Sequence, residues 1–160
     1  MLIVLLAAAP ALAQEWDVVD DEHDVTLSLS ALHLMVPMVE ATAEFRVSPA
    51  RSVAVIGGIG GNDGFMVWDV GGQARQYFIG DFDTGLNVGA EAKWETADYL
   101  TPDAWDYPTT GRLAAGPFIG AKLTLALFTL EAQGGGQFVW QPGGDLDLGP
   151  LLNVNAGVSF

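Results

Sequence analysis

The residues with the clearest potential for catalysis are Ser28, Ser30, His33 and Glu40, which lie close together in the sequence. A serine, a histidine and an acid are the parts of a nucleophilic relay, in which the histidine accepts the serine proton. Both serines stand an odd number of positions from His33, so in an extended strand they face away from it. Across a short hairpin, Glu40 could reach His33. The spacing favours a packed histidine without a catalytic role, and an enzyme using His33 remains an alternative.

The stretch VAVIGGIGGNDG at 53–64 resembles the start of a dinucleotide-binding unit, a strand followed by glycines. The fingerprint G-x-G-x-x-G begins at Gly58 and Gly60 but finds Asp63 where its third glycine belongs. The residues that follow alternate with period two, so no helix N-terminus is available to hold a pyrophosphate. We therefore expect no bound cofactor.

Acidic clusters could in principle bind cations. Residues 14–24 contain four acids and a histidine in immediate succession (DDEHD), but adjacent side chains rarely converge on one ion, so a solvated extension is favoured over a cation site. Asp81 and Asp83 form a D-x-D pair that is typical of turn chemistry. The chain has no cysteine, which excludes disulfides and thiolate metal sites. We expect no metal site.

The overall charge and the first residues restrict the environment of the chain. A net charge of −14 makes nucleic-acid binding improbable, because the surface repels phosphate. Residues 1–13, MLIVLLAAAPALA, are apolar and end in small residues, which predicts a secretory signal peptide although no basic residue precedes it. An acidic extension, 14–23, and a single β domain, 24–160, would follow.

Alternation of apolar and polar residues dominates the rest of the chain and predicts strands. It is clearest in 148–160, where Leu152, Val154 and Val158 alternate with Asn153, Asn155 and Ser159. Similar runs occupy 24–34, 38–47, 52–61, 65–79, 85–96, 112–122, 126–140 and 148–160. Eight strands of this kind predict an all-β, antiparallel up-and-down barrel.

The connections support an outer-membrane barrel, in which short turns at one end alternate with longer loops at the other. The short connections are 48–51, 81–84 and 123–125, and the longer ones are 60–64, 96–110 and 141–147. The join near Pro37 is an exception, because it should be long and is short.

A soluble lipocalin-like barrel has the same alternation but turns its apolar face inward. Two features favour a membrane barrel, in which the apolar face points outward. First, the polar faces carry acids and bases that could neutralise one another in a narrow lumen: Glu40, Glu44, Arg46, Arg75, Glu91, Lys93 and Glu131. Second, aromatic residues fall at two depths, as membrane interfaces select: Trp68, Trp94 and Trp140 at the loop end, and Phe45, Phe78 and Phe160 at the turn end.

In length, strand number, signal segment and final strand LLNVNAGVSF, the chain resembles the small eight-stranded outer-membrane barrels of OmpA/OmpX type. The resemblance implies a bacterial outer-membrane location, contact with outer-membrane lipid, and recognition of the strand ending in Phe160 by the barrel-assembly machinery. It says little about activity.

We expect a non-catalytic barrel with a structural or surface-interaction role and a lumen filled by side chains, since eight strands leave room for little else. A narrow cation-preferring channel is an alternative, because lumen acids outnumber bases. A lipid-modifying enzyme with His33 at the rim is a further one. Tyr99, Trp105 and Tyr107 in the 96–110 loop could contact an external partner or form a lid over the barrel mouth.

Overall fold

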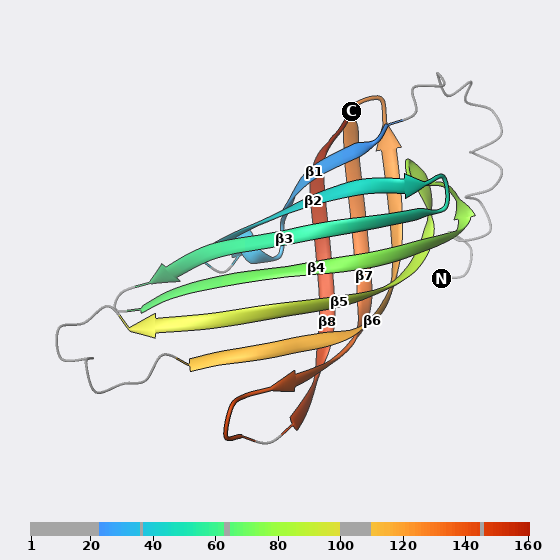
Figure 1. Cartoon of the computed structure of the whole chain (residues 1–160). Coiled ribbons are helices and arrows are strands. Elements are labelled where there is room, and N and C mark those ends of the chain that lie inside the picture. Colours follow the sequence, from blue (N-terminus) through green and yellow to red (C-terminus); the bar gives the residue numbers. More distant parts are fainter. Residues whose placement is uncertain (1–22, 36, 63–64, 100–109, 145) are drawn as a thin grey trace, which may run out of the picture.

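The structure is a closed barrel of eight antiparallel strands in sequence order, shown in Figure 1. This computed structural model describes residues 23–35, 37–62, 65–99, 110–144 and 146–160. The all-β barrel expected from the sequence is confirmed. Its strands are β1 (Val25–Ser30), β2 (Met38–Ser48), β3 (Arg51–Asn62), β4 (Phe65–Gly80), β5 (Thr84–Tyr99), β6 (Thr110–Leu125), β7 (Phe128–Trp140) and β8 (Leu146–Ser159).

Each strand pairs with its neighbours along the chain, and β1 closes the barrel against β8. The seam pairs Thr26 with Ser159 and Ser30 with Asn155. We call the end with connections 49–50, 81–83 and 126–127 the turn end, and the end with connections 31–37, 63–64, 100–109 and 141–145 the loop end. This pairing closes the barrel, and β8, which begins at Leu146, extends past the end of β1 toward the loop end.

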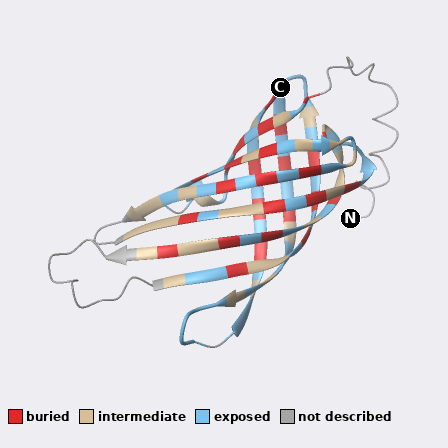
Figure 2. Ribbon diagram, viewed as in Figure 1, coloured by how far each residue is buried: buried red, intermediate tan, exposed pale blue. Residues whose placement is uncertain are grey.

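Burial follows the period of the strands, and Figure 2 shows buried and exposed bands alternating along each of them. Of the described residues, 22 polar or charged ones are buried, against seven hydrophobic ones. In contrast, large hydrophobic residues cover the outside, including Val55, Val88 and Val154. The polarity is the reverse of that in a soluble domain, where apolar side chains form the core.

The first strand is shorter than expected. It ends at Ser30, not at 34, and a short 3-10 helix, η1 (His33–Met35), follows. The Ser30 hydroxyl accepts a hydrogen bond from the His33 backbone N–H at 3.4 Å, a side-chain turn that diverts the chain from the extended path. The connection to β2 therefore spans 31–37, so the short join expected near Pro37 is wrong.

Two other connections also differ from expectation. The glycines at 60–61 belong to β3, which continues to Asn62, so only 63–64 separate β3 from β4. A side chain at Gly60 would collide with the backbone of Pro37 and Met38, which explains why this strand position carries glycine. The tight join expected at 123–125 is instead at 126–127, where Ala126 has a φ of 53°.

The end of the acidic extension is not solvated as expected. His23 is buried, and its Nδ1 lies 2.9 Å from Asp83 Oδ1 in the turn between β4 and β5. Asp81 uses its carboxylate for that turn, accepting the backbone N–H groups of Asp83 and Thr84 at 3.0 and 3.1 Å. The signal segment 1–13 and residues 14–22 lie outside the described residues.

No helix in the described part of the chain has the length and apolar character needed to cross a membrane.

Candidate functional site in the barrel lumen

Glu44 is the centre of a cluster near the turn end of the lumen. Its carboxylate accepts hydrogen bonds from Tyr77 Oη at 2.8 Å and Lys122 Nζ at 2.9 Å, and Arg75 Nη1 lies 3.0 Å away. The backbone brings these groups together from three strands, β2, β4 and β6, because each group occupies an inward position of its strand. A carboxylate excluded from water is stable only when paired in this way.

Arg75 extends this cluster across the lumen. Its Nη1 is 2.6 Å from Glu131 Oε1, and its Nε donates to Gln73 Oε1 at 2.9 Å. We name Glu44, Arg75, Lys122 and Glu131 the turn-end cluster. It contains two carboxylates and two cations, so its charges balance, and the side chains of Arg75 and Lys122 are 0% exposed.

Phe82 closes the turn end beneath this cluster. It lies in the turn between β4 and β5 yet is 0% exposed, because its ring points into the barrel. The ring packs edge-on against Tyr77, with centroids 6.4 Å apart, and Lys122 Nζ sits 3.6 Å from its centroid. Aromatic and cation–π contacts therefore seal the end that the ion pairs alone would leave open.

A second cluster lies toward the loop end, around Lys93. Its Nζ is 2.8 Å from Glu40 Oε2 and 3.8 Å from both Asp69 Oδ2 and Glu91 Oε1. We name Glu40, Asp69, Glu91 and Lys93 the loop-end cluster. All four residues are buried. Here three carboxylates face one ammonium group, so this cluster, unlike the first, is unbalanced.

Gln73 joins the two clusters into one network. Its Nε2 donates to Glu91 Oε2 at 2.5 Å and to Gln133 Oε1 at 3.1 Å, while its Oε1 accepts from Arg75. Gln133 in turn donates to Glu131 at 2.5 Å. Side chains thus connect across the lumen from the turn end to the loop-end cluster.

His33 lies above the loop-end cluster and contacts both serine and acid partners. Its Nδ1 is 2.8 Å from Ser30 Oγ and 3.2 Å from Glu40 Oε1. The expected reach of Glu40 is confirmed, but the expectation that Ser30 faces away from His33 is wrong, because the strand ends at Ser30. The nearby Glu40 carboxylate raises the pKa of His33 above its ordinary value, although partial burial opposes this.

This arrangement differs from a catalytic relay. In a relay one imidazole nitrogen faces the serine and the other faces the acid. Here Nδ1 faces both Ser30 and Glu40. Ser30 donates its hydroxyl proton to Asn153 Oδ1 at 2.7 Å, so its oxygen accepts from His33 instead of surrendering a proton to it. Ser28 is buried at an inward position of β1.

The structure places six of the seven residues expected in the lumen network inside the barrel: Glu40, Glu44, Arg75, Glu91, Lys93 and Glu131. Arg46 differs, because it lies at the barrel edge and its Nη2 pairs with Asp24 Oδ1 at 2.9 Å. Sequence reasoning left out several members of the network: Asp69, Gln73, Tyr77, Lys122 and Gln133. The alternation of β4 places Asp69, Gln73 and Tyr77 on the inward face, so their parity could have included them.

Four of the six aromatic residues expected in two bands are exposed. Phe45, Phe78 and Phe160 are exposed at the turn end, and Trp140 is exposed at the loop end. Trp68 and Trp94 are half-buried, and the Trp94 indole donates to Thr96 Oγ1 at 3.0 Å. Phe128, at the start of β7, adds a further exposed ring to the turn-end band.

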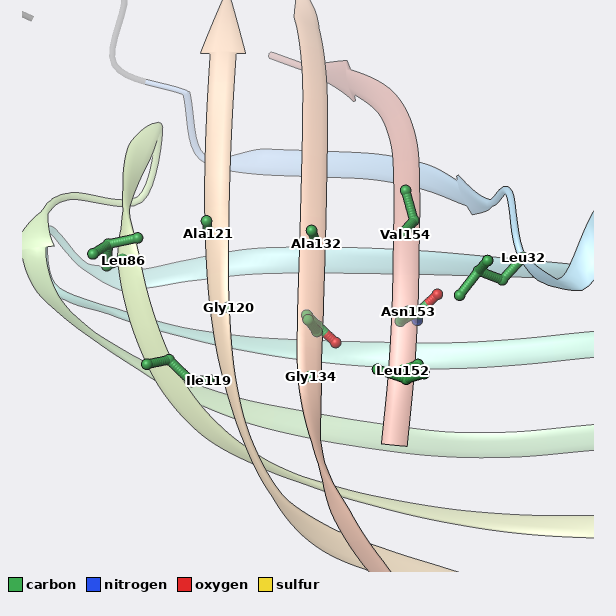
Figure 3. A pocket seen from close by; sticks show the side chains of 11 residues that line it. Leu32, Leu86, Ile119, Gly120, Ala121, Ala132, Gly134, Leu152, Asn153 and Val154 are labelled. Atoms are coloured by element: carbon green, nitrogen blue, oxygen red, sulfur yellow. The ribbon is translucent and has the colours of Figure 1, made fainter. Parts of the chain in front are cut away.

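A shallow apolar groove of about 460 Å³ crosses the outer wall over β5 to β8, as Figure 3 shows. Its walls include Leu86, Ile119, Leu152 and Val154, and alanines at 121 and 132 form part of its floor. The groove is therefore a depression in the hydrophobic exterior, separated from the polar lumen by the sheet.

Within the described residues, no three histidine, aspartate or glutamate side chains are arranged to hold a metal ion. Comparisons of the chain with protein-family models, with curated proteins and with solved structures gave no match.

Proposed function

We propose that the protein is a small outer-membrane β-barrel of the OmpA/OmpX type, with a structural or surface-interaction role and no catalysis. The carrying observation is the inversion of polarity between lumen and exterior. Fully buried Glu40, Glu44 and Arg75 inside, with exposed valines, leucines and phenylalanines outside, suit a barrel whose surrounding solvent is hydrocarbon. In water such an exterior would be an aggregation surface.

The exterior supports this placement in further ways. Exposed Phe45, Phe78 and Phe160 stand near one end and Trp140 near the other, where aromatic rings favour membrane interfaces. The groove over β5 to β8 is lined by apolar side chains that lipid acyl chains can cover. Bacterial outer-membrane lipid is therefore the proposed environment.

Two segments of the chain support the proposed export and assembly. Residues 1–13 would act as a cleaved signal peptide, with 14–22 leading into the barrel. The final residue continues the β8 pairing, since Phe160 N–H donates to Val25 O at 2.9 Å while its ring remains exposed. An exposed terminal aromatic on the closing strand suits recognition by the barrel-assembly machinery.

The filled lumen favours a closed barrel over the channel alternative. Arg75 joins Glu44 and Glu131 across the interior, and Phe82 seals the turn end. The lipid-modifying alternative receives less support, because Ser30 does not face a free imidazole nitrogen of His33. An external partner for the 96–110 loop remains part of the proposal; its central part, 100–109, lies outside the described residues.

Expression of the full chain with its signal segment, followed by cell fractionation, tests the proposal. We expect a processed protein in the outer-membrane fraction, and a band whose gel mobility changes on heating because the closed barrel resists detergent at lower temperature. Recovery in the soluble fraction, with no mobility change, would contradict it. Absence of steady conductance in planar bilayers is expected for the closed lumen, and a cation-selective current would favour the channel.

A further inference from the structure

The two lumen clusters differ in charge balance, although both are buried. In the turn-end cluster, Arg75 and Lys122 neutralise Glu44 and Glu131. In the loop-end cluster Lys93 opposes three carboxylates, and among the residues that the structure describes His33 is the one additional titratable base in contact with it. A buried excess of negative charge is costly, and proteins relieve it by binding a counter-charge or by protonating a carboxylate.

Among the described residues, two buried carboxylate oxygens of the loop-end cluster have no hydrogen-bond donor. Asp69 Oδ1 and Glu40 Oε1 are buried and receive no hydrogen bond in the described part of the chain, although His33 Nδ1 approaches Glu40 Oε1 to 3.2 Å. The side chains of Asp69 and Glu40 are 1% and 0% exposed. Both carboxyl groups approach the same Lys93 ammonium, Glu40 Oε2 to 2.8 Å and Asp69 Oδ2 to 3.8 Å, so a hydrogen bond from one to the other is the contact that would satisfy both remaining oxygens. Two carboxylates are both acceptors, so that bond forms only when one of them carries a proton.

A proton fits this position better than a second cation. The ammonium group of Lys93 already stands among the three carboxylates, 2.8 Å from Glu40 and 3.8 Å from Asp69, and would repel another positive ion. A side chain added at Gly58 would meet Asp69 Oδ1 at 2.5 Å, so the carboxyl group also lies tightly against β3.

We propose that the loop-end cluster is a proton-binding site, in which Asp69 is held as a neutral carboxylic acid and donates its O–H to Glu40. Glu40 stays ionised and accepts from Lys93 through its other oxygen. On loss of the proton to solvent, the O–H bond of Asp69 breaks and the cluster gains one negative charge. When Asp69 and His33 are both protonated, the positive groups of Lys93 and His33 face the carboxylates of Glu40 and Glu91. The charges of the loop-end cluster then balance, as they do in the turn-end cluster.

The site would make the barrel sensitive to pH at its loop end. The charged groups around Asp69 are Glu40 on β2, Lys93, Glu91 and Glu95 on β5, and His33 on η1. In the pH range where the folded state holds this proton and the unfolded state does not, the free energy of unfolding falls as the pH rises. This inference concerns the lumen alone and holds whether or not the barrel resides in a membrane.

The substitution Asp69→Asn tests the proposal in the full-length folded protein. An asparagine amide donates to Glu40 without a titratable proton, so the variant should keep its folded structure. At mildly alkaline pH its denaturation midpoint should be higher than that of the unsubstituted protein. The difference in midpoint between mildly acidic and mildly alkaline pH should shrink relative to the unsubstituted protein. Measuring both proteins with His33→Gln added removes the contribution of the histidine.

Glu131→Gln is the matched control, since it removes a carboxylate from the balanced cluster and should lower the midpoint at both pH values. Infrared spectroscopy provides a second readout that needs no folded variant: the unsubstituted protein should show a protonated-carboxyl band at mildly acidic pH that disappears on alkalisation. Absence of that band, or an unchanged pH dependence in Asp69→Asn, would overturn the proposal. So would a loss of stability in Asp69→Asn at both pH values, as in the control.

Discussion

Lys122 Nζ lies 3.6 Å above the ring of Phe82 while donating hydrogen bonds to Thr26 and Glu44 at 2.8 and 2.9 Å. The turn at 81–83 therefore contributes the floor of the lumen as well as the connection between β4 and β5. The ring shields the turn-end cluster from water, which strengthens the ion pairs above it.

Replacing Phe82 by alanine should open this floor. We expect a loss of about 3–5 kcal/mol in the free energy of unfolding, the range for removing a buried phenylalanine ring. Urea unfolding of the detergent-folded protein, followed by tryptophan fluorescence, measures the effect. Phe128→Ala is a suitable control, because that ring is on the outer wall at the same end and is 73% exposed. Equal losses in the two variants would argue against a sealing role for Phe82.

The balance of the turn-end cluster predicts strong coupling between Glu44 and Lys122. Glu44→Gln leaves Arg75 and Lys122 sharing one carboxylate and should cost about 3–5 kcal/mol. Adding Lys122→Met restores the charge balance. The double variant should therefore lose less free energy of unfolding than the two single variants lose together, by about 1 kcal/mol or more. Additive losses would contradict the coupling.

Glu95→Gln serves as the comparison for that experiment. Glu95 pairs with Arg112, whose side chain is 52% exposed, so its loss should cost about 0–1 kcal/mol.

The proposed membrane placement predicts that depth decides the effect of an outward charge. Val55 is in the middle of β3 and Val47 is near the turn end of β2, and both are exposed. Val55→Arg should reduce folding stability in lipid vesicles by about 2–4 kcal/mol, and Val47→Arg by about 0–1 kcal/mol. If both variants remain as stable as the parent, the outer wall does not face hydrocarbon.

The contact between His33 and Glu40 predicts a pH dependence of its own. Because the pKa of His33 is raised in the folded state, the pairing stabilises the barrel fully below the unfolded pKa of about 6.5. This contribution is lost as the pH rises through the folded-state pKa. NMR titration of the imidazole, with His23→Gln used for assignment, should give a midpoint above the unfolded value. The midpoint should fall in Glu40→Gln, and an unshifted midpoint in the parent protein would contradict the pairing.

Strand parity carried most of the sequence-based prediction. In β5 and β8 the alternation is regular, so the inward positions of Glu91, Lys93 and Asn155 followed directly from it. Lys122 was missed because β6 has glycine and alanine on both faces, which hides the parity of its buried cation. The backbone chemistry of the 81–83 turn was foreseeable, but nothing in a turn motif indicates that the Phe82 ring enters the lumen.

The contact between Ser30 and His33 was missed for a different reason. Parity applies only while the backbone stays extended, and Ser30 itself ends β1 by bonding to the His33 backbone. Ser30, one of the residues to which parity was applied, thus itself ends the extended segment in which parity holds.

The seam between β1 and β8 joins side chains far apart in the chain: Ser30 bonds to Asn153 across 123 positions, and Thr26 to Ser159 across 133. Until those two strands meet, there is no enclosed interior, and the inward acids and bases have only water as a partner. A chain whose β1 and β8 have not yet paired therefore lacks the stabilisation that the lumen network provides. Long-range closure of this kind is slow. Under the proposed membrane placement, the polypeptide must therefore be kept from aggregating until its apolar outer face reaches lipid.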